Sequence, residues 1–573
     1  MKKHRRLGVR LIAAVSALAI VAAACGDDDD EPGGSGSTSD IGQETTTTLD
    51  NTQLQVGGEI VDLGTFVGDP PEHIDPALNV TLDAYQVVNA LYDGLTDIDT
   101  SDPANPKIVP HVAESYEAND DATVWTFTIR DGVEFSNGEQ VLPSSFVRAW
   151  ERASNPDFAG DYSYLFNFIK GGAEKLAGDA ETIAGVTADD EAMTLTVELS
   201  SPYSTFDAIA GFQLFLPMPS AVDELDDQSE WENGLMIGNG PFKLEKPRTD
   251  EEIVLVRNDG WAGDANGDTT VTLDKVTFRT SADPDSAYNA FEAGEGDTAN
   301  IPSGRVSEAE DNYATTLDVG ILGVYYFELK QTDPVVGGEE NVDLRRAISL
   351  AVNRDEINEA VYENTRQNAT GVTPPGIPGF KEGLCEYCIY DQARAQELFD
   401  GWKADGNEIT EPIKVQFNAG AGHEDVVAII VDNLDAIGIP AVATPIDGET
   451  YFTQLAEGAC QFCRSGWFAD YPTYDNFSYD LFHSDAIGGN NHGEHNNPEY
   501  DELIDEAKAT TDPAKSAELF QQAETMLLND DVTVIPINWY KGDYVYNPEK
   551  ISSFPQNNFG LIAWERVTVT DAG

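Results

Sequence analysis

The most restrictive pattern in this chain is a strand, a helix and a second strand that follow one another between residues 412 and 446. Residues 412–417 and 439–446 have the composition of strands, and residues 424–437 carry an apolar side chain every three or four positions. Gly438 comes directly after this helical stretch, where a glycine commonly ends a helix. Because strands joined by a helix run parallel with a right-handed crossover, the second half of the chain is predicted to be α/β.

The first half of the chain has a different pattern. Residues 123–129 and 193–199 alternate apolar and polar side chains, as half-buried strands do, and residues 144–152 form a short amphipathic helix. Residues 97–202 are therefore expected to be a compact α+β domain. Further helices are expected at 344–352 and 500–529, with a last buried strand at 532–537. A chain of 573 residues is too long for one hydrophobic core, so two or three domains are expected.

The N-terminus has the pattern of an export signal. A basic segment precedes the apolar run 11–24, which is too short to span a bilayer, so residues 1–24 are predicted to be a signal peptide. Residues 22–26, Ala-Ala-Ala-Cys-Gly, resemble a bacterial lipobox, and this resemblance implies cleavage before Cys25 and lipidation of that residue. The alternative is ordinary secretion, with Cys25 merely inside the cleavage region.

The residues after the signal are polar. Residues 25–56 are rich in Asp, Gly, Ser and Thr, cannot bury enough apolar surface to fold, and are predicted to be a flexible acidic tether. The expected location is the extracytoplasmic face of a bacterial cell membrane, in the periplasm or at the cell surface. The chain has 102 acidic and 33 basic residues, which argues against nucleic acid and against anionic lipid headgroups as partners.

Four further cysteines form two Cys-x-x-Cys pairs, and they are Cys385, Cys388, Cys460 and Cys463. In an exported protein such cysteines are disulfide candidates. The sequence leaves all three pairings open. A structural zinc site is the alternative that the same spacing allows.

Several blocks of sequence together resemble the peptide-binding proteins of ABC transporters, which are solute-binding family 5 and include oligopeptide- and dipeptide-binding lipoproteins. The blocks occur in the same order as in that family, at residues 74–77, 90–95, 111–116, 125–138, 239–244, 344–349, 466–472 and 535–537. The resemblance covers essentially everything from residue 57 to the C-terminus.

The resemblance implies a two-lobed α/β fold of the periplasmic-binding-protein type II, with an extra α+β domain inserted in the first lobe. By this likeness, lobe I comprises residues 57–96, 203–325 and 537–573. The inserted domain comprises 97–202, and lobe II comprises 326–536. The lobes would close around a ligand bound between them.

The binding residues implied by the resemblance lie in the motif that runs from Arg464 to Asp470. A free peptide is a zwitterion, so its receptor needs an acid and a base, and buried charges of this kind must be paired. In the family, the Asp of this motif binds the α-amine and the Arg binds the carboxylate of a tripeptide; here they are Asp470 and Arg464. The alternatives are a surface turn for Asp470, before Tyr471-Pro472, and a plain salt bridge for Arg464.

Other residues of the motif are expected to complete the site. Gly466 and Phe468 would offer backbone groups to an extended peptide, as in strand addition. Trp467 would form a wall of the cleft, although a core position is an equally good interpretation. Tyr164 is a candidate contact from the inserted domain. Some relatives have a Cys at the position of Phe468, whereas this chain has Cys460 and Cys463 just upstream.

Two groups of residues have the composition of possible metal sites, and each also has a simpler interpretation. Asp264, Asn266 and Asp268 have the spacing of a calcium loop, but position 275 is Lys275 where a calcium loop needs an acid. A polar surface loop is the simpler interpretation. His483, His492 and His495 resemble nickel-binding relatives, and a solvated loop is the alternative. No cofactor is expected.

The predicted function is capture of short peptides and their delivery to the permease subunits of an ABC importer, which is driven by cytoplasmic ATPases. The alternative is a receptor of the same fold for another solute, such as a cello-oligosaccharide or nickel. An enzyme is not expected, because the sequence has no Gly-x-Ser-x-Gly elbow and no recognisable nucleophile–base pair or metal triad.

Overall fold

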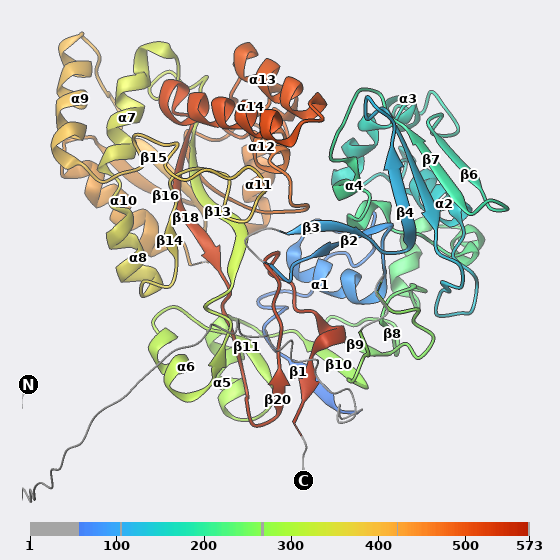
Figure 1. Cartoon of the computed structure of the whole chain (residues 1–573). Helices are drawn as coiled ribbons and strands as arrows, with labels where there is room; N and C mark the ends of the chain where they lie inside the picture. The colour runs from blue at the N-terminus through green and yellow to red at the C-terminus, as the bar shows by residue number, and fades with distance from the viewer. Residues whose placement is uncertain (1–56, 103–105, 265–268, 421, 571–573) are drawn as a thin grey trace, which may run out of the picture. The chain divides into compact units, whose positions relative to one another are not determined.

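The computed structural model describes residues 57–102, 106–264, 269–420 and 422–570. The predicted signal peptide, Cys25 and the predicted tether lie outside the described residues. No helix within these ranges combines the length and the apolar character needed to cross a membrane. Three larger sheets and two small two-stranded ones organise the described residues (Figure 1).

The first sheet joins segments from distant parts of the chain. Its central strand β1 runs parallel to both β10 and β11. The order is β12-β19-β11-β1-β10-β9-β8, with bounds β1 (Glu59–Asp62), β8 (Phe242–Leu244), β9 (Glu252–Arg257), β10 (Lys275–Arg279), β11 (Thr298–Asn300), β12 (Ala314–Thr315) and β19 (Tyr544–Tyr546). Helices in these same parts of the chain are α1 (Leu82–Leu91), α5 (Pro284–Glu292) and α6 (Val306–Asn312).

The second sheet belongs to the predicted inserted domain and is antiparallel throughout. Its order is β4-β5-β7-β6, with bounds β4 (Ala113–Ala118), β5 (Val124–Ile129), β6 (Val186–Asp189) and β7 (Thr194–Glu198). The predicted strands at 123–129 and 193–199 and the predicted helix at 144–152 are confirmed, the helix as α2 (Pro143–Ala153). Short helices α3 (Gly172–Leu176) and α4 (Phe206–Ile209) and the paired strands β2 (Thr96–Asp99) and β3 (Lys107–Pro110) complete this region.

The third sheet contains the predicted strand–helix–strand unit. Its order is β14-β18-β13-β17-β15-β16, with bounds β13 (Gly320–Leu329), β14 (Gln367–Asn368), β15 (Ile413–Asn418), β16 (Ala441–Ile446), β17 (Phe462–Phe468) and β18 (Val534–Lys541). Strand β15 is parallel to β16, and α10 (Glu424–Asp435) connects them, so the α/β prediction is confirmed. Gly438 has a φ of 79°, the left-handed conformation expected after a helix.

Strand β13 shows why this third sheet has helices on both faces. Alternate side chains of a strand point to opposite faces. Phe327 and Leu329 pack in one core with α7 (Val342–Ala351), α8 (Arg354–Tyr362), α9 (Gln392–Ala404) and α10. Val324 and Tyr326 pack in another core with α12 (Asp475–Phe482), α13 (Pro498–Ala509) and α14 (Pro513–Thr525). Figure 1 shows these two helix groups on opposite sides of β13 and β18.

Two details differ from, or add to, the sequence expectation. The helical stretch expected at 500–529 is two helices, because Asp512 caps the start of α14 by accepting from the Ala514 and Lys515 amides at 3.0 and 3.2 Å. The expected lobe limits at 325/326 and 536/537 fall inside β13 and β18, and the lobe limits stay a prediction. The chain ends with a small pair, β20 (Ile551–Ser553) and β21 (Thr568–Val569).

Each Cys-x-x-Cys pair closes on itself. Cys385 is bonded to Cys388 and Cys460 to Cys463, each with a Cα–Cα distance of 5.4 Å. This is one of the three pairings that the sequence left open. All four side chains are buried.

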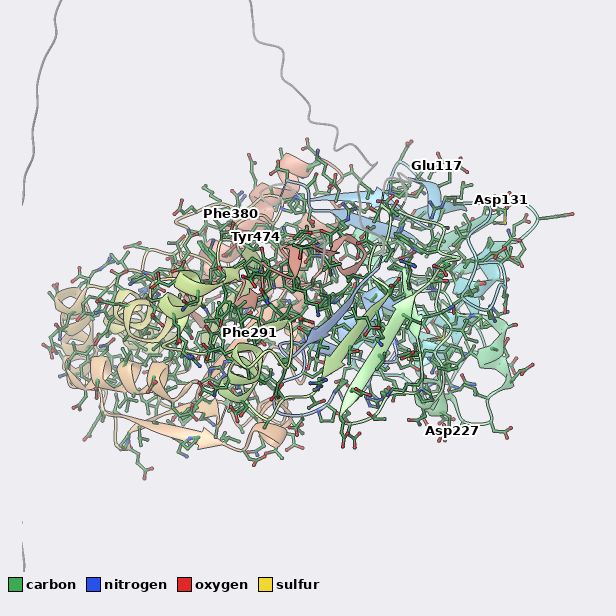
Figure 2. All side chains as sticks on the ribbon, turned by 90° about the horizontal axis from the view of Figure 1, so that it is seen from below. Glu117, Asp131, Asp227, Phe291, Phe380 and Tyr474 are labelled. Atoms are coloured by element: carbon green, nitrogen blue, oxygen red, sulfur yellow. A yellow bond between two sulfur atoms is a disulfide. The ribbon has the colours of Figure 1, made fainter. Side chains whose placement is uncertain are left out.

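The acidic residues and the apolar residues separate as the hydrophobic effect requires. Figure 2 shows Asp131 and Asp227 at the outer margin of the molecule, and both are exposed. Phe291 and Tyr474 lie among other side chains in the same view, and both are buried. The large negative charge is therefore carried mainly by solvated side chains.

Candidate ligand-binding site

Strand β17 has one open edge. It pairs with β13 along its whole length, from Phe462 to Phe468, but with β15 only at Phe462 and Cys463. Where β15 and β17 separate, the Tyr451 hydroxyl donates to the Gln416 carbonyl at 3.2 Å and to the Arg464 carbonyl at 2.8 Å. Beyond this point the β15 side of β17 has no partner strand among the described residues.

The backbone groups that face the open edge follow from strand geometry. Successive residues of a strand direct their N–H and C=O groups to opposite sides. The Ala469 amide donates to the Leu322 carbonyl at 2.7 Å, so odd-numbered residues face β13. Gly466 and Phe468 therefore face the open side, as the Arg464 carbonyl does. A Cβ at position 466 would lie 2.5 Å from the Tyr540 hydroxyl oxygen, so a larger residue there would have to displace that side chain.

Asp470 lies just beyond the end of this edge. The Tyr162 hydroxyl donates to its Oδ1 at 2.9 Å, and the Asn476 side-chain amide donates to its Oδ2 at 3.1 Å. The Asp470 amide in turn donates to Asn476 Oδ1 at 2.9 Å. Burial raises the pKa of Asp470 to about 7, and the charge of Asp480 acts in the same direction, while the two hydrogen bonds to the carboxylate oppose the shift.

Two further carboxylates lie on the helix that follows Asp470. Asp475 accepts from the Tyr203 hydroxyl, and Asp480 accepts from the Tyr471 hydroxyl at 2.7 Å. Burial, with the neighbouring charge of Asp475, raises the pKa of Asp480 to about 6. This end of the site is rich in carboxylates held by phenol groups, and it favours a cation.

The phenol contacts come from the inserted domain. Tyr162 and Tyr164 both lie on one 3-10 helix, at 161–168. Tyr162 contacts Asp470 directly. Tyr164 is a half-buried neighbour of the same carboxylates, because burial and the charges of Asp480 and Asp470 raise its pKa well above the usual value.

Arg464 lies at the other end of the open edge and lacks an acidic partner. Within the described part of the chain, no carboxylate lies within 4.0 Å of its guanidinium, and its buried Nε has no hydrogen-bond partner. Its Nη1 makes a long contact to Asn418 Oδ1, at 3.4 Å, and its Cζ lies 5.0 Å from the centre of the Tyr325 ring. Burial and the charges of Arg464 and Arg366 lower the pKa of His423 to about 3, so this end is positive without a protonated histidine.

The aromatic residues of the motif differ in exposure. The half-buried Trp467 donates from its indole nitrogen to Asn476 Oδ1 at 3.2 Å, so it braces the same amide that holds Asp470. Phe468 is 38% exposed and stacks on Tyr540 with ring centres 4.5 Å apart. Phe468 also lines a cavity of about 340 Å³.

The residues of the two possible metal sites have other partners or lie outside the described residues. Asp264 Oδ2 accepts from Thr269 at 2.6 Å and from Arg566 at 3.3 Å, while Asn266 and Asp268 lie outside the described residues. His483, His492 and His495 are buried and each contacts a different protein group, so they do not form a solvated loop. No group of three or more His, Cys, Asp or Glu in the described ranges is arranged to hold a metal ion.

The structure has α/β sheets covered by helices, an open strand edge on β17 and a cavity beside that edge. This arrangement is the two-lobed fold of solute-binding proteins. Residues 107–489 match the family model described as "Bacterial extracellular solute-binding proteins, family 5 Middle". The chain therefore belongs to family 5 of the bacterial extracellular solute-binding proteins, as the sequence resemblance predicted.

Individual relatives match almost the whole chain. The chain is 27% identical over 507 residues to the dipeptide-binding protein DppE of Bacillus subtilis, covering 86% of this chain and 89% of the relative. It is 28% identical over 478 residues to the oligopeptide-binding protein OppA of the same organism, covering 80% and 84%. The solved complex of Haemophilus influenzae OppA with RPPGFSPFR has a TM-score of 0.74 and 25% identity, and covers 90% of this chain and 100% of that one.

Several residues around the site were missed from the sequence. Tyr162, Tyr451 and Asn476 reach it only through tertiary contacts. The sequence signal for Tyr162 was present, since it lies two residues before the candidate Tyr164 on the same short helix. Arg366 had no local signal, because its neighbours in sequence give no hint of a site.

Proposed function

We propose that this protein captures short peptides between its lobes and delivers them to the permease subunits of an ABC importer. The observation that carries the proposal is the open edge of β17, which has a half-buried carboxylate at one end and, at the other, a guanidinium without an acidic partner among the described residues. A zwitterionic, extended ligand with free backbone groups is complementary to all three features. The relatives named for oligopeptide and dipeptide binding support the same ligand class.

Asp470 binds the α-amine of the peptide in this proposal. Two neutral donors already orient its carboxylate, and an ammonium group would supply the cationic partner that Asp470 lacks among the described residues, whereas Lys508 acts on the neighbouring Asp480. An ionised carboxylate buried without a cation is unstable, which is the physical reason for its raised pKa. Ligand binding would therefore lower the pKa of Asp470 again.

Arg464 binds a carboxylate of the peptide in this proposal. The chain has about three acidic residues for each basic one, yet no acid within the described residues has been placed against this guanidinium. The planar fork of an arginine binds a carboxylate through two parallel hydrogen bonds. The Tyr325 ring lies beside the guanidinium, with its centre 5.0 Å from Cζ.

The peptide backbone pairs with the open edge between these two charges. Gly466 and Phe468 supply the N–H and C=O groups, so binding does not depend on the ligand's side chains. Trp467 supports the edge through Asn476, and Tyr164 lies beside the amine position. Because backbone from 464 to 470 extends at most about 20 Å, peptides of three to about six residues fit between the charges.

Closure of the lobes completes the mechanism. The proposed lobe I is 57–96, 203–325 and 537–573, the inserted domain is 97–202, and lobe II is 326–536. Contacts between these parts support a closed form: Tyr162 with Asp470, and the Ser204 amide with the Lys508 carbonyl at 3.3 Å. A ligand amine on Asp470 would strengthen the first of these contacts, so binding and closure are coupled.

The location follows from the N-terminus and the family. The proposed signal peptide is removed before Cys25, which is lipidated, and residues 25–56 tether the folded part to the extracytoplasmic face of the membrane. The family description as extracellular supports this location. The protein acts as a receptor and carrier, and no catalytic role is proposed.

Isothermal titration of the mature protein with a mixed tri- to pentapeptide library tests the proposal. The test variant is Asp470→Asn, and the matched control is Asp131→Asn, because Asp131 is exposed at the margin of the molecule. Binding by the wild type and the control, but not by D470N, supports the proposal. Binding of cello-oligosaccharides without any binding of peptides would overturn it.

A further inference from the structure

Arg366, like Arg464, has neither an acidic partner nor a set of backbone carbonyls around its guanidinium among the described residues. Most described arginines form ion pairs, and the others mainly donate to backbone carbonyls; Arg345 and Arg354, for example, are each held by several carbonyls. Arg464 and Arg366 are exceptions to both patterns. Among the described residues no carboxylate lies within 4.0 Å of the Arg366 guanidinium.

The position of Arg366 is nevertheless fixed by its surroundings. The Asn358 side chain donates to the Arg366 carbonyl at 2.6 Å and accepts from its amide at 3.3 Å. The guanidinium lies over the Tyr362 ring at 3.8 Å and near the Tyr540 ring at 4.8 Å. These contacts hold the guanidinium in place, and none of them is with a carboxylate that would neutralise its charge.

Polar hydrogen-bonding capacity also remains free beside Arg366. Its Nη1 donates to Asn538 Oδ1 at 3.3 Å, a long contact. Asn538 is 1% exposed, and its side-chain nitrogen has no hydrogen-bond partner within the described part of the chain. The long contact leaves most of the hydrogen-bonding capacity of the Arg366 guanidinium for a ligand acceptor, whereas Asn538 itself does not line the adjoining cavity.

Arg366 lines the cavity of about 340 Å³ that adjoins the open edge of β17. Phe468, the last residue of that edge, lines the same cavity and stacks on Tyr540. Leu82 and Gln86 of α1 line it from the proposed lobe I. A side chain of a peptide paired with the edge at Phe468 therefore has a volume to enter, and Arg366 lies in its wall.

The other charged groups of the cavity are Lys541, Asp83 and Asp543. Asp83 accepts from the Ala84 amide at 2.9 Å, and Asp543 accepts from the Asn300 side chain at 3.2 Å. The charge of Arg366 already acts on Asp543 and partly offsets the rise in its pKa that burial causes, so Asp543 would weaken the attraction of Arg366 for a ligand carboxylate.

We infer that Arg366 binds the side-chain carboxylate of one acidic residue of the ligand, so that the cavity at Phe468 selects peptides with Asp or Glu at a single position. The inference rests on the proposed function, because it assigns a side-chain preference to the same cleft. Backbone pairing on the open edge does not depend on the side chains of the peptide. Arg366 would add a preference for an acidic side chain at one position.

The test is a titration series with alanine tetrapeptides in which Glu or its neutral isostere Gln occupies each position in turn. The wild type is expected to bind Glu about tenfold more tightly than Gln at one position only. Arg366→Gln is expected to remove this preference while binding the Gln peptide within about threefold of the wild type. Arg394→Gln, a change at an exposed arginine paired with Glu386, is the matched control.

Further variants distinguish a failure of this inference from a failure of the proposed function. Arg366→Lys keeps the charge but loses the fork, and is expected to retain part of the preference; Asp543→Asn is expected to increase it. The inference is overturned if Glu and Gln peptides bind the wild type equally at every position. It is also overturned if R366Q weakens all free-acid peptides alike and C-terminal amidation cancels that effect, since Arg366 would then read the peptide terminus. If no peptide binds the wild type at all, the proposed function fails as well.

Discussion

The two ends of the open edge of β17 are built in opposite ways. At the acidic end, hydroxyl and amide donors already occupy both oxygens of Asp470, and one of these donors comes from the inserted domain. At the basic end, the Arg464 guanidinium has one long amide contact and a buried nitrogen without a partner in the described residues. The comparison teaches that the amine position is fixed in advance, whereas the carboxylate position is completed only by the ligand.

This asymmetry suits ligands of varied length. Every peptide has its α-amine at one end, so a single prepared acid serves all of them. The carboxylate lies at a different distance from the amine in each length class, so a base that is left free of protein partners is the more adaptable arrangement. The predictions below test whether the two ends differ in this way.

The largest effect is expected at the acidic end. Asp470→Asn keeps the size and the hydrogen bonds with Asn476 but removes the charge that pairs with the ligand amine. Loss of one partner from a buried charge pair is expected to weaken tripeptide binding about 100-fold, measured by calorimetry. N-acetylated peptides are the control: they should bind the wild type weakly and should not distinguish it from D470N.

The pH dependence should come from the same end. The pKa of Asp470 is about 7 without ligand, and a peptide α-amine has a pKa of about 8, so binding should be strongest near pH 7.5. Affinity should fall about 20-fold between pH 7.5 and 5.5, as Asp470 becomes protonated. Asp480 titrates nearby with a pKa of about 6, whereas His423 stays neutral in this range.

The D470N variant gives the matched pH profile. Its affinity should change far less between pH 5.5 and 7.5 than that of the wild type, although Asp480 still titrates nearby in this range. A profile as steep as that of the wild type would assign the pH dependence to another group and remove Asp470 from the account. The raised pKa also makes the free energy of unfolding depend on pH. Without ligand, Asp470 destabilises the fold progressively as the pH rises from about 4 to 7.

A smaller and more selective effect is expected at the basic end. Arg464→Gln should weaken a free-acid tripeptide about tenfold, because hydrogen bonds to a charged group are lost. The same change should leave the C-amidated tripeptide within about twofold. Equal losses for acid and amide would mean that Arg464 supports the cleft without contacting the ligand carboxylate.

The smallest effect concerns the phenol that orients Asp470. Tyr162→Phe removes the hydroxyl that donates to Asp470 Oδ1 and should weaken all peptides about threefold to tenfold, irrespective of length. Tyr288→Phe, a change at a buried tyrosine of α5 whose hydroxyl has no hydrogen-bond partner within the described residues, is the control, and its binding should match that of the wild type. A length-dependent loss in Y162F would contradict a purely orienting role.

Much of this fold is visible in the sequence, because it depends on local periodicity. The strand–helix–strand unit at 412–446 and the strands of the inserted domain were predicted within a few residues. The break before Pro513 was missed, although Asp512 and Pro513 together are a typical helix start. The Cys-x-x-Cys pairings were left open, since spacing alone does not choose among them.

The residues of the binding site also fall into a group that the sequence shows and a group that it does not. The motif from Arg464 to Asp470 could be found because it is contiguous, and the open edge within it follows from the register of β17. Tyr162 and Asn476 join the site through the packing of separate elements, and Arg366 lies almost a hundred residues before the motif. No local pattern records such contacts, so tertiary structure is required to identify them.

The most direct test of the central claim is one calorimetric titration of the wild-type protein with four forms of a single tripeptide: unmodified, N-acetylated, C-amidated and doubly blocked. Acetylation is expected to weaken binding about 100-fold and amidation about tenfold, and D470N in a parallel titration should lose the effect of acetylation. Equal affinity for all four forms would contradict this claim, because neither Asp470 nor Arg464 would then bind a charged terminus of the peptide.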